Sequence, residues 1–347
     1  MIQESRIKVL VVDDSAIVRK VLTDTLSTEP DIEIVGTAPD PFVARDKILS
    51  LNPDVLTLDI EMPRMDGVTF LKKLMHYHPM PVIVISSLGV ASGRAALEAL
   101  AAGAIDVFAK PGGPQSVGEL SLSLASKIRA AKGAKLRKAS PKVSTPPSTR
   151  LVTEQPFPAA SVIAIGASTG GTEAIQRILS DLPENCPGIV ITQHIPAVFS
   201  RSFANRLNEL CAVRVREAEN GDRVEPGLAL VAPGNFHMLL RGSSTGYRVE
   251  IKDGPMVCFQ RPAVDVLFHS VAQVAGPNAT AAILTGMGSD GALGMLALKK
   301  AGARTIAQDE ATCVVFGMPK EAIRHGAVDR VLPLGAIPGA ILAESRR

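Results

Sequence analysis

Short, continuous apolar runs alternate with segments of helical length through most of this chain, and this pattern constrains the fold most strongly. Segments such as Ser15–Ser27 and Asp66–His78 have the length of helices. Strands that are apolar throughout belong to parallel sheets covered by helices on both faces. The first part of the chain is therefore predicted to be a (βα)5 domain with a flavodoxin-like parallel sheet. Its expected strands lie at 7–12, 31–36, 54–58, 81–86 and 105–108.

The alternation resumes after residue 159. Two stretches in the middle of this second region, 228–240 and 247–255, have the pattern of hairpins. We therefore predict a doubly wound α/β domain with a β-hairpin insertion. Its expected parallel strands are VIAIG at 162–166, IVITQ at 189–193, AAILT at 281–285 and ARTIA at 303–307.

A basic stretch separates the two regions. Residues 127–150 contain eight Lys or Arg and no acidic residue, and Pro, Ser and Thr crowd the second half of the stretch. A basic segment of this kind contacts nucleic acid or a membrane surface in some proteins, but the composition favours a solvated linker. We predict a first domain at 1–130, a flexible linker at 131–158 and a second domain at 159–347.

The composition limits the function classes. Aromatic residues make up 3% of the chain, Trp is absent and the formal net charge is +3, so we expect no nucleic-acid partner. The N-terminus lacks a signal-peptide pattern and no apolar run has the length of a membrane span, so we expect a cytoplasmic protein without direct membrane insertion. The cysteines show no metal-type spacing and are predicted to be reduced core residues; they are Cys186, Cys211, Cys258 and Cys313.

Polar residues follow the strands of the first domain at the edge where ligands of parallel sheets collect. Asp13 and Asp14 follow the first strand, and Asp59 follows the third. Three carboxylates at one edge repel one another unless a cation lies among them, and Mg²⁺ suits an oxygen-only site. Ser86 and Lys110 follow the fourth and fifth strands, where they would contact an added phosphoryl group. Helix capping explains any one of these acids alone, but it does not explain why a polar residue follows each of these strands in turn.

The region from about residue 5 to 130 resembles the receiver domain of bacterial response regulators. The matching motifs are DD at 13–14, LDIEMPRMDG at 58–67, ISS at 85–87 and KP at 110–111. The resemblance implies that Asp59 accepts phosphate from a histidine kinase, and that Asp13, Asp14 and the backbone carbonyl of Glu61 help to hold Mg²⁺. It also implies that Ser86 and Lys110 sense the phosphate. Val107 stands where many receivers carry an aromatic switch residue.

The second domain opens with GASTG at 166–170, the G-x-S-x-G spacing of a nucleophile elbow. The glycines permit a tight turn that presents Ser168, and the following helix start directs N–H groups, that of Thr169 among them, toward an oxyanion. A phosphate-binding turn or a purely structural turn has the same appearance. A dinucleotide site fits less well, because Ser168 replaces the middle glycine and Gln193-His194 replaces the expected acid.

Two further strand ends supply partners for this serine. His194 ends the IVITQ strand as a candidate general base, and Asp290 lies in the glycine-rich loop GMGSDG at 286–291 as its orienting acid. Each residue alone is more typical of a packed histidine or a helix cap. Together with Ser168 they predict a catalytic triad. His237 is a weaker candidate base because it lies in a hairpin.

With both domains considered, the chain resembles the chemotaxis protein-glutamate methylesterases, the CheB family. The phrases that carry the resemblance are IGASTGGTEA, TQHIP, RPAVDVLF at 261–268, ILTGMGSDG at 283–291 and FGMPKEAI at 316–323. The family implies the triad Ser168, His194 and Asp290, with the backbone N–H of Met287 in the oxyanion hole. It implies hydrolysis, without a cofactor, of glutamate γ-methyl esters on cytoplasmic chemoreceptor helices, deamidation of glutamines there, and a chemotaxis-type histidine kinase as phosphodonor.

Other functions stay open at this point. A non-catalytic regulator whose second domain only binds a protein would not need the three triad residues together. A nucleotide-binding output domain predicts stabilisation by nucleotide. We also expect that the unphosphorylated first domain blocks the Ser168 site; the competing hypothesis is that phosphorylation improves docking on the receptor. The segments around Phe236 and 261–268 are candidate pocket walls, although Phe236, Val264 and Phe268 are predicted to lie in the core.

Overall fold

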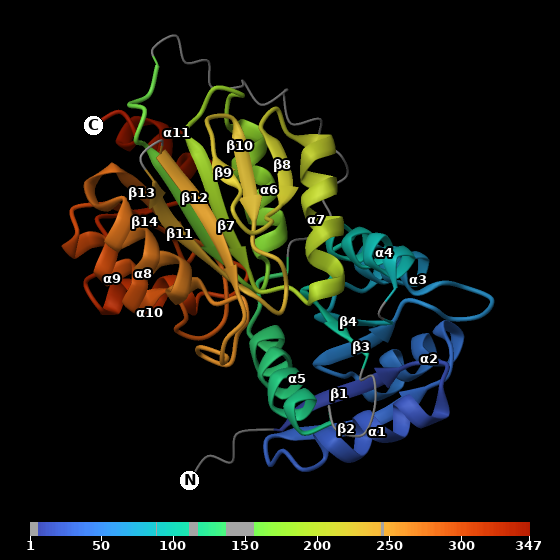
Figure 1. Ribbon diagram of the computed structural model, residues 1–347. Coiled ribbons are helices and arrows are strands. Elements are labelled where there is room, and N and C mark those ends of the chain that lie inside the picture. The colour runs from blue at the N-terminus through green and yellow to red at the C-terminus, as the bar shows by residue number, and fades with distance from the viewer. Residues whose placement is uncertain (1–5, 88, 111–116, 137–155, 244–245) are drawn as a thin grey trace. The chain divides into compact units, whose positions relative to one another are not determined.

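The computed structural model describes residues 6–87, 89–110, 117–136, 156–243 and 246–347. The chain divides into two compact units, Met1–Pro141 and Lys142–Arg347 (Figure 1). Helix α5 of the first unit ends at Lys132, and most of the predicted linker, 137–155, lies outside the described residues, as does Pro111 of the predicted KP pair. The domain boundaries at 130 and 158 stay predictions.

The first unit is a five-stranded parallel sheet with helices between the strands. The strand order is β2-β1-β3-β4-β5, as expected for a flavodoxin-like (βα)5 domain. The strands are β1 (Ile7–Val12), β2 (Ile32–Ala38), β3 (Val55–Asp59), β4 (Val82–Ser86) and β5 (Asp106–Ala109). The helices are α1 (Ala16–Leu26), α2 (Pro41–Leu51), α3 (Gly67–Tyr77), α4 (Val90–Ala101) and α5 (Val117–Lys132). The predicted fold class of this domain is confirmed.

The second unit contains a seven-stranded parallel sheet in the order β15-β14-β13-β6-β7-β10-β8. These strands are β6 (Val162–Ala167), β7 (Gly188–Gln193), β8 (Arg214–Glu217), β10 (Leu228–Val231), β13 (Ala279–Ile283), β14 (Arg304–Gln308) and β15 (Arg330–Leu332). The central pair β6 and β7 is buried along its whole length. The predicted doubly wound α/β class is therefore confirmed.

The β insertion differs from the sequence prediction in one element. The stretch 228–240 is not a hairpin, because its first half, β10, pairs in parallel with β7 and β8 in the main sheet. The hairpin is formed by β11 (His237–Ser243) and β12 (Gly246–Lys252), and β9 (Arg223–Val224) adds a third antiparallel strand. All four residues of β10 are buried, and burial on both faces is typical of a strand inside a covered sheet.

Helices cover both faces of the seven-stranded sheet (Figure 1). One group is α6 (Gly171–Asp181), α7 (Ala197–Leu210) and α11 (Ile337–Glu344); the other is α8 (Val264–Val274), α9 (Ala292–Lys300) and α10 (Met318–Arg324). Helix α8 lies close to β6, because a β-carbon at Gly166 would be 2.3 Å from Val264 Cγ1 and 3.0 Å from Phe268 Cζ. Val264 and Phe268 are fully buried, which confirms their predicted core role.

The cysteines only partly match the prediction. All four are free, and Cys186 and Cys313 are buried. Cys211 is half-buried and Cys258 is exposed, so the prediction that every cysteine lies in the core is wrong for these two. Phe236 is 43% exposed, and its predicted core role is also wrong. Both Cys258 and Phe236 lie in connections of the β insertion, where sequence periodicity gives no indication of burial.

The close approach of α8 to β6 predicts that Gly166→Ala destabilises the second unit. The added methyl group overlaps Val264, and overpacking of this kind costs about 1–3 kcal/mol. Thermal unfolding of the full chain measures the effect. Gly339→Ala is the control, because nothing lies within 4 Å of a β-carbon at that helical position and Ala is the better helix former. Equal stability of the two variants would contradict the packing argument.

Candidate functional site

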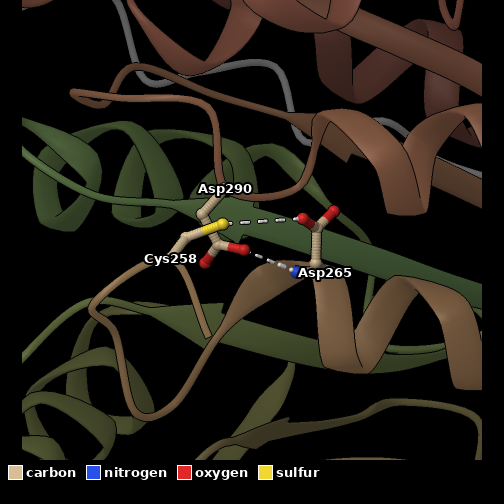
Figure 2. A group of neighbouring side chains, drawn as sticks. All are labelled: Cys258, Asp265 and Asp290. Carbon is tan, nitrogen blue, oxygen red and sulfur yellow. Dashed lines mark hydrogen bonds between the residues drawn. The ribbon is translucent and has the colours of Figure 1, made fainter. Parts of the chain in front are cut away.

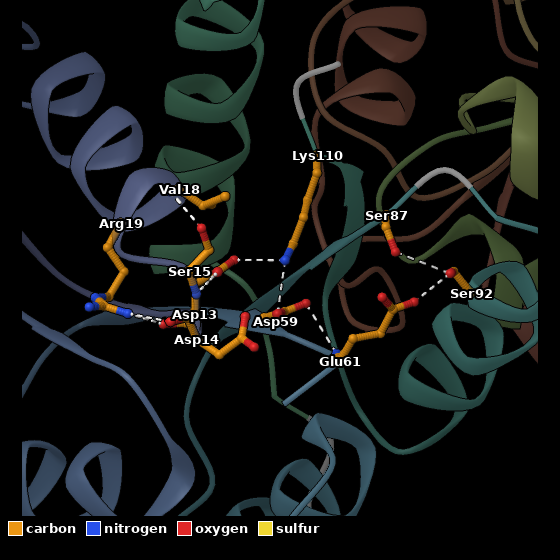
Figure 3. A network of polar contacts seen from close by, with 10 residues as sticks. All are labelled: Asp13, Asp14, Ser15, Val18, Arg19, Asp59, Glu61, Ser87, Ser92 and Lys110. Carbon is orange, nitrogen blue, oxygen red and sulfur yellow. Dashed lines mark hydrogen bonds and ion pairs between the residues drawn. The ribbon is translucent and has the colours of Figure 1, made fainter. Parts of the chain in front are cut away.

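Four of the predicted polar residues of the first unit meet at the carboxyl edge of its sheet: Asp13, Asp14, Asp59 and Lys110 (Figure 3). Lys110 Nζ lies 2.8 Å from Asp59 Oδ2 and 3.0 Å from Asp13 Oδ2. Asp13 and Asp59 are each 1% exposed, whereas Asp14 is exposed. Ser15, not Asp14, caps helix α1, so capping does not account for the pair of acids.

The pKa values of Asp59 and Lys110 are both shifted in this buried cluster. Burial, with the nearby Asp13 charge added, raises the pKa of Asp59 from 3.8 to about 6, although the hydrogen bond from Lys110 lowers it. Burial alone lowers the pKa of Lys110, but its contacts with Asp59 and Asp13 raise it overall. The lysine therefore stays charged between two carboxylates that would otherwise repel each other.

The donor set fits a hard divalent cation. Ligand atoms of Asp13, Asp14 and Asp59 all lie within 4.8 Å of one another, and every ligand atom is an oxygen. The side chain of Glu61 points away from them and accepts a 2.6 Å hydrogen bond from Ser92 Oγ, so its predicted contribution is limited to the backbone (Figure 3). Ser86 Oγ is buried and has no hydrogen-bond partner among the described residues.

The raised pKa predicts that Asp59→Asn stabilises the first unit at neutral pH without Mg²⁺. Because the folded pKa of about 6 exceeds the unfolded value of 3.8, ionised Asp59 destabilises the folded state as pH rises through this window. At pH 7.5 the variant should gain about 1–3 kcal/mol, and the gain should vanish near pH 4. Unfolding of the full chain in chelator measures it, with exposed Asp24→Asn as control. A gain independent of pH would contradict the assignment.

Ser168 in the second unit lies immediately after β6, in a turn with little freedom. Its N–H donates to the carbonyl of Thr285 at 3.0 Å, and its carbonyl accepts from Gly171 N–H at 2.7 Å. Gly170 has a φ of 77° and caps α6, a left-handed conformation that favours glycine. Ser168 is 7% exposed. The turn therefore holds the serine at the sheet edge, as the elbow pattern predicts.

His194 follows the neighbouring strand β7, and its N–H donates to the carbonyl of Ala167, directly before Ser168. Its Nε2 atom lies 2.7 Å from Asp290 Oδ2, and both side chains are almost completely buried. Nδ1 is buried without a hydrogen-bond partner within the described part of the chain. If Nε2 carries the proton that it shares with Asp290, Nδ1 presents a lone pair and the ring has the tautomer of a general base.

The Asp290 carboxylate is held by the N-terminus of helix α8. Oδ2 accepts the N–H of Val264 at 2.7 Å, and Oδ1 accepts the N–H of Asp265 at 2.9 Å. In return, the Asp265 side chain accepts the N–H of Gly294 in the first turn of α9, at 2.6 Å. Asp290 thus caps α8 and Asp265 caps α9. Figure 2 shows the bond from the Asp265 N–H to Asp290, and the α8 dipole stabilises the negative charge of Asp290.

The loop with Met287 lies against the serine. A β-carbon at Gly286 would be 2.7 Å from Ser168 Cβ, and the Gly286 carbonyl accepts the N–H groups of Gly317 and Met318. The Met287 N–H has no acceptor among the described residues. Thr169 is buried, and its carbonyl accepts a 3.0 Å bond from Thr285 Oγ1. The Met287 loop and the turn with Thr169 therefore both lie next to Ser168.

Three contributors to the site were not identified from the sequence. Gln193 Nε2 donates to the carbonyls of Ser168 and His194, so it ties two strand ends together. Thr285 anchors the turn after β6, and the backbone of Asp265 holds Asp290. Gln193 lies in the motif TQHIP and Asp265 in RPAVDVLF, so membership of these motifs was the sequence feature that could have identified them.

His237, the weaker candidate base, has both ring nitrogens occupied, by the Pro255 carbonyl and the Ala263 N–H, so it is not a base.

Comparisons with known proteins agree with this organisation. Residues 163–341 match the CheB methylesterase family, and residues 9–120 match the response regulator receiver domain. A protein-glutamate methylesterase/protein-glutamine glutaminase of Syntrophus aciditrophicus is 58% identical over 339 residues, which cover 97% of this chain and 99% of that protein. A protein of the same name from Salmonella typhimurium is 53% identical over 342 residues, 98% of this chain and 97% of the relative.

A solved structure supports the fold of the second unit. The catalytic domain of Thermotoga maritima CheB methylesterase is 39% identical, with a TM-score of 0.52, and the match covers 54% of this chain and 99% of that domain. Across the residues that the structure describes, no helix has the length and apolar character needed to cross a membrane.

Proposed function

The chain belongs to the CheB methylesterase family, with a response regulator receiver domain before the catalytic domain, and from this premise we propose a phosphorylation-activated serine hydrolase with the triad Ser168, His194 and Asp290. Its substrates are glutamate γ-methyl esters on chemoreceptor helices. The observation that carries the triad is the 2.7 Å contact of His194 Nε2 with Asp290, which leaves Nδ1 for the serine on the adjacent strand end.

Catalysis begins with proton transfer from Ser168 Oγ to His194 Nδ1 as the oxygen attacks the ester carbonyl. The protonated imidazole then donates its proton to the methoxy oxygen, and methanol leaves from the acyl-enzyme. Water, deprotonated by the same nitrogen, attacks the acyl group and releases glutamate. A glutamine side chain has the same acyl group, so the same steps with ammonia as leaving group deamidate it.

The surrounding structure stabilises the charges that develop. Asp290 holds the imidazole and stabilises the imidazolium, while its own charge is balanced by the N–H groups at the start of α8. The N–H groups of Met287 and Thr169 are proposed to bind the oxyanion. These donors are backbone groups fixed by the fold, so little reorganisation is needed during the reaction.

Activation belongs to the receiver unit, whose family implies Mg²⁺-dependent phosphorylation by a histidine kinase. We assign Asp59 as phosphoacceptor and Asp13, Asp14, Asp59 and the Glu61 carbonyl as Mg²⁺ ligands. When bound, the ion supplies positive charge that offsets the repulsion between the aspartates and the phosphoryl group. Lys110 and the unpartnered Ser86 hydroxyl then contact phosphoryl oxygens.

The proposed partners follow from this chemistry. The phosphodonor is a chemotaxis-type histidine kinase, and the substrates are the cytoplasmic helices of chemoreceptors, so the enzyme acts in the cytoplasm. The hydrolase needs no cofactor, because Ser168 and His194 supply both the nucleophile and the proton transfers. A regulator that only binds its partner is the competing function, and it predicts no chemistry at Ser168.

Ser168→Ala is expected to abolish methanol release from methylated chemoreceptor membranes, because the substitution removes the attacking oxygen. Loss of a triad serine lowers the rate by several orders of magnitude. Wild type and variant are compared with and without acetyl phosphate and Mg²⁺, and wild-type release should increase with the phosphodonor. Equal release by the two proteins would show that Ser168 is only a turn residue, and no release from either would favour the binding regulator.

The Asp290→Asn variant tests which nitrogen of His194 carries the proton. With the Asn oxygen in the place of Oδ1, it still accepts the Asp265 N–H. The NH2 group then takes the place of Oδ2, where it loses the bond from the Val264 N–H, faces His194 Nε2 and forces the imidazole proton onto Nδ1. The base is then blocked in an intact fold, and kcat should fall by about 10⁴, the size of the analogous effect in a serine protease. Asp181→Asn, at the end of α6, is the control. A variant with near wild-type kcat would remove Asp290 from the triad.

A further inference from the structure

The segment Val257–Gln260 forms a tight turn with an unusual sequence. Val257 and Gln260 exchange two backbone hydrogen bonds, of 3.1 and 2.9 Å, so the turn has two central residues. These are Cys258, with a φ of 51°, and Phe259, with a φ of 60°. Two successive residues with positive φ define a type I′ turn, which strongly favours Asn-Gly. A cysteine and an aromatic residue here carry backbone strain that the turn itself does not require.

The side chain of Phe259 makes no compensating contribution to the core. It is 86% exposed, the largest exposure among the large hydrophobic residues described. The exposed ring buries too little surface to offset the backbone strain, and Gly would adopt the same φ without that strain. Backbone strain of this kind is concentrated at functional sites, and exposed aromatic residues are frequent anchors in protein interfaces.

The turn lies directly beside the triad. Cys258 Sγ is 4.0 Å from the carboxylate of Asp265, whose N–H holds Asp290 (Figure 2). Burial raises the pKa of the Cys258 thiol, and the charges of Asp290 and Asp265 raise it further, so the thiol is neutral at the acidic edge of the site. The residue directly before Phe259 therefore lies next to Asp265, which holds the proposed catalytic acid.

A surface suited to a helix continues from this turn. Met256, just before the turn, and Leu293, in the first turn of α9, are about half exposed, and Leu293 lines the same cavity as Cys258. Beside them is a cavity of about 590 Å³, lined on one side by Cys258, Asp265 and Leu293 and on the other by Lys320 and Arg324 of α10. Lys320 and Arg324 are four residues apart and so lie on one face of the helix.

We propose that Phe259 is a substrate anchor that packs against the chemoreceptor helix and so determines specificity for the protein substrate. The proposal rests on the proposed function and adds the residue that recognises the helix. A glutamyl side chain is shorter than the roughly 10 Å width of the helix that carries it. When the side chain reaches Ser168, the helix itself must therefore lie against the surface around Ser168. Hydrolysis leaves carboxylates on the helix, and Lys320 provides a complementary charge, whereas Arg324 is paired with Glu321 at 2.7 Å.

The test compares two substrates and two variants of the full chain. Phe259→Ala removes the anchor. The double change Cys258→Asn with Phe259→Gly removes the anchor and relieves the strain, and it should raise the unfolding midpoint by about 2–4 °C. For both variants, kcat/KM on methylated chemoreceptor membranes should fall about tenfold or more, mostly through KM. Hydrolysis of a soluble γ-methyl ester of N-acetylglutamate amide should change less than twofold.

The control is Leu210→Ala, which removes a half-exposed apolar side chain at the end of α7, and it should leave both activities unchanged. Unchanged receptor demethylation by both turn variants would overturn the anchor. An equal loss on both substrates would also overturn it, because the turn would then act through the triad geometry. Failure of the wild-type protein itself to demethylate receptors would contradict the proposed function, and the inference with it.

Discussion

The catalytic site depends on the Asp290 carboxylate, which accepts three donors from two different parts of the second unit. Two are the N–H groups at the start of α8, and the third is the imidazole of His194. Because Asp265 caps α9 in return, the loop that carries Asp290 is fixed to both helices that flank it. A charge buried in this way is stabilised by fixed dipoles.

The two units use buried acids in opposite ways. Asp290 is surrounded by donors and is proposed to support proton transfer at His194. Asp59 is buried beside Asp13, and burial raises its pKa to about 6, with Lys110 only partly offsetting the repulsion. In the proposed mechanism the receiver site gains a cation and a phosphoryl group, whereas Asp290 already has hydrogen-bond donors around it. The acid of the regulatory unit therefore lies beside another acid, whereas the acid of the hydrolase unit is surrounded by hydrogen-bond donors.

Much of each site could be predicted because parallel strands end at one edge. Asp13, Asp59, Lys110, Ser168 and His194 are all next to or immediately beyond apolar runs that are easy to recognise. The prediction failed where burial depends on partners distant in sequence. The stretch around β10 has the sequence pattern of a hairpin strand, and only its pairing with β7 and β8 shows that it belongs to the parallel sheet. Phe236 and Cys258 are apolar residue types in loops, and only the tertiary structure shows that they are exposed.

The sequence by itself determined the two α/β units, the order of the site residues and the family, because these follow from local periodicity and from motifs at strand ends. Only the tertiary structure decided which imidazole nitrogen faces Asp290, that α8 holds this acid, and that a strained turn exposes Phe259 beside it. The physical reason is that tautomer, capping and exposure depend on contacts between segments far apart in the chain, which no local pattern specifies.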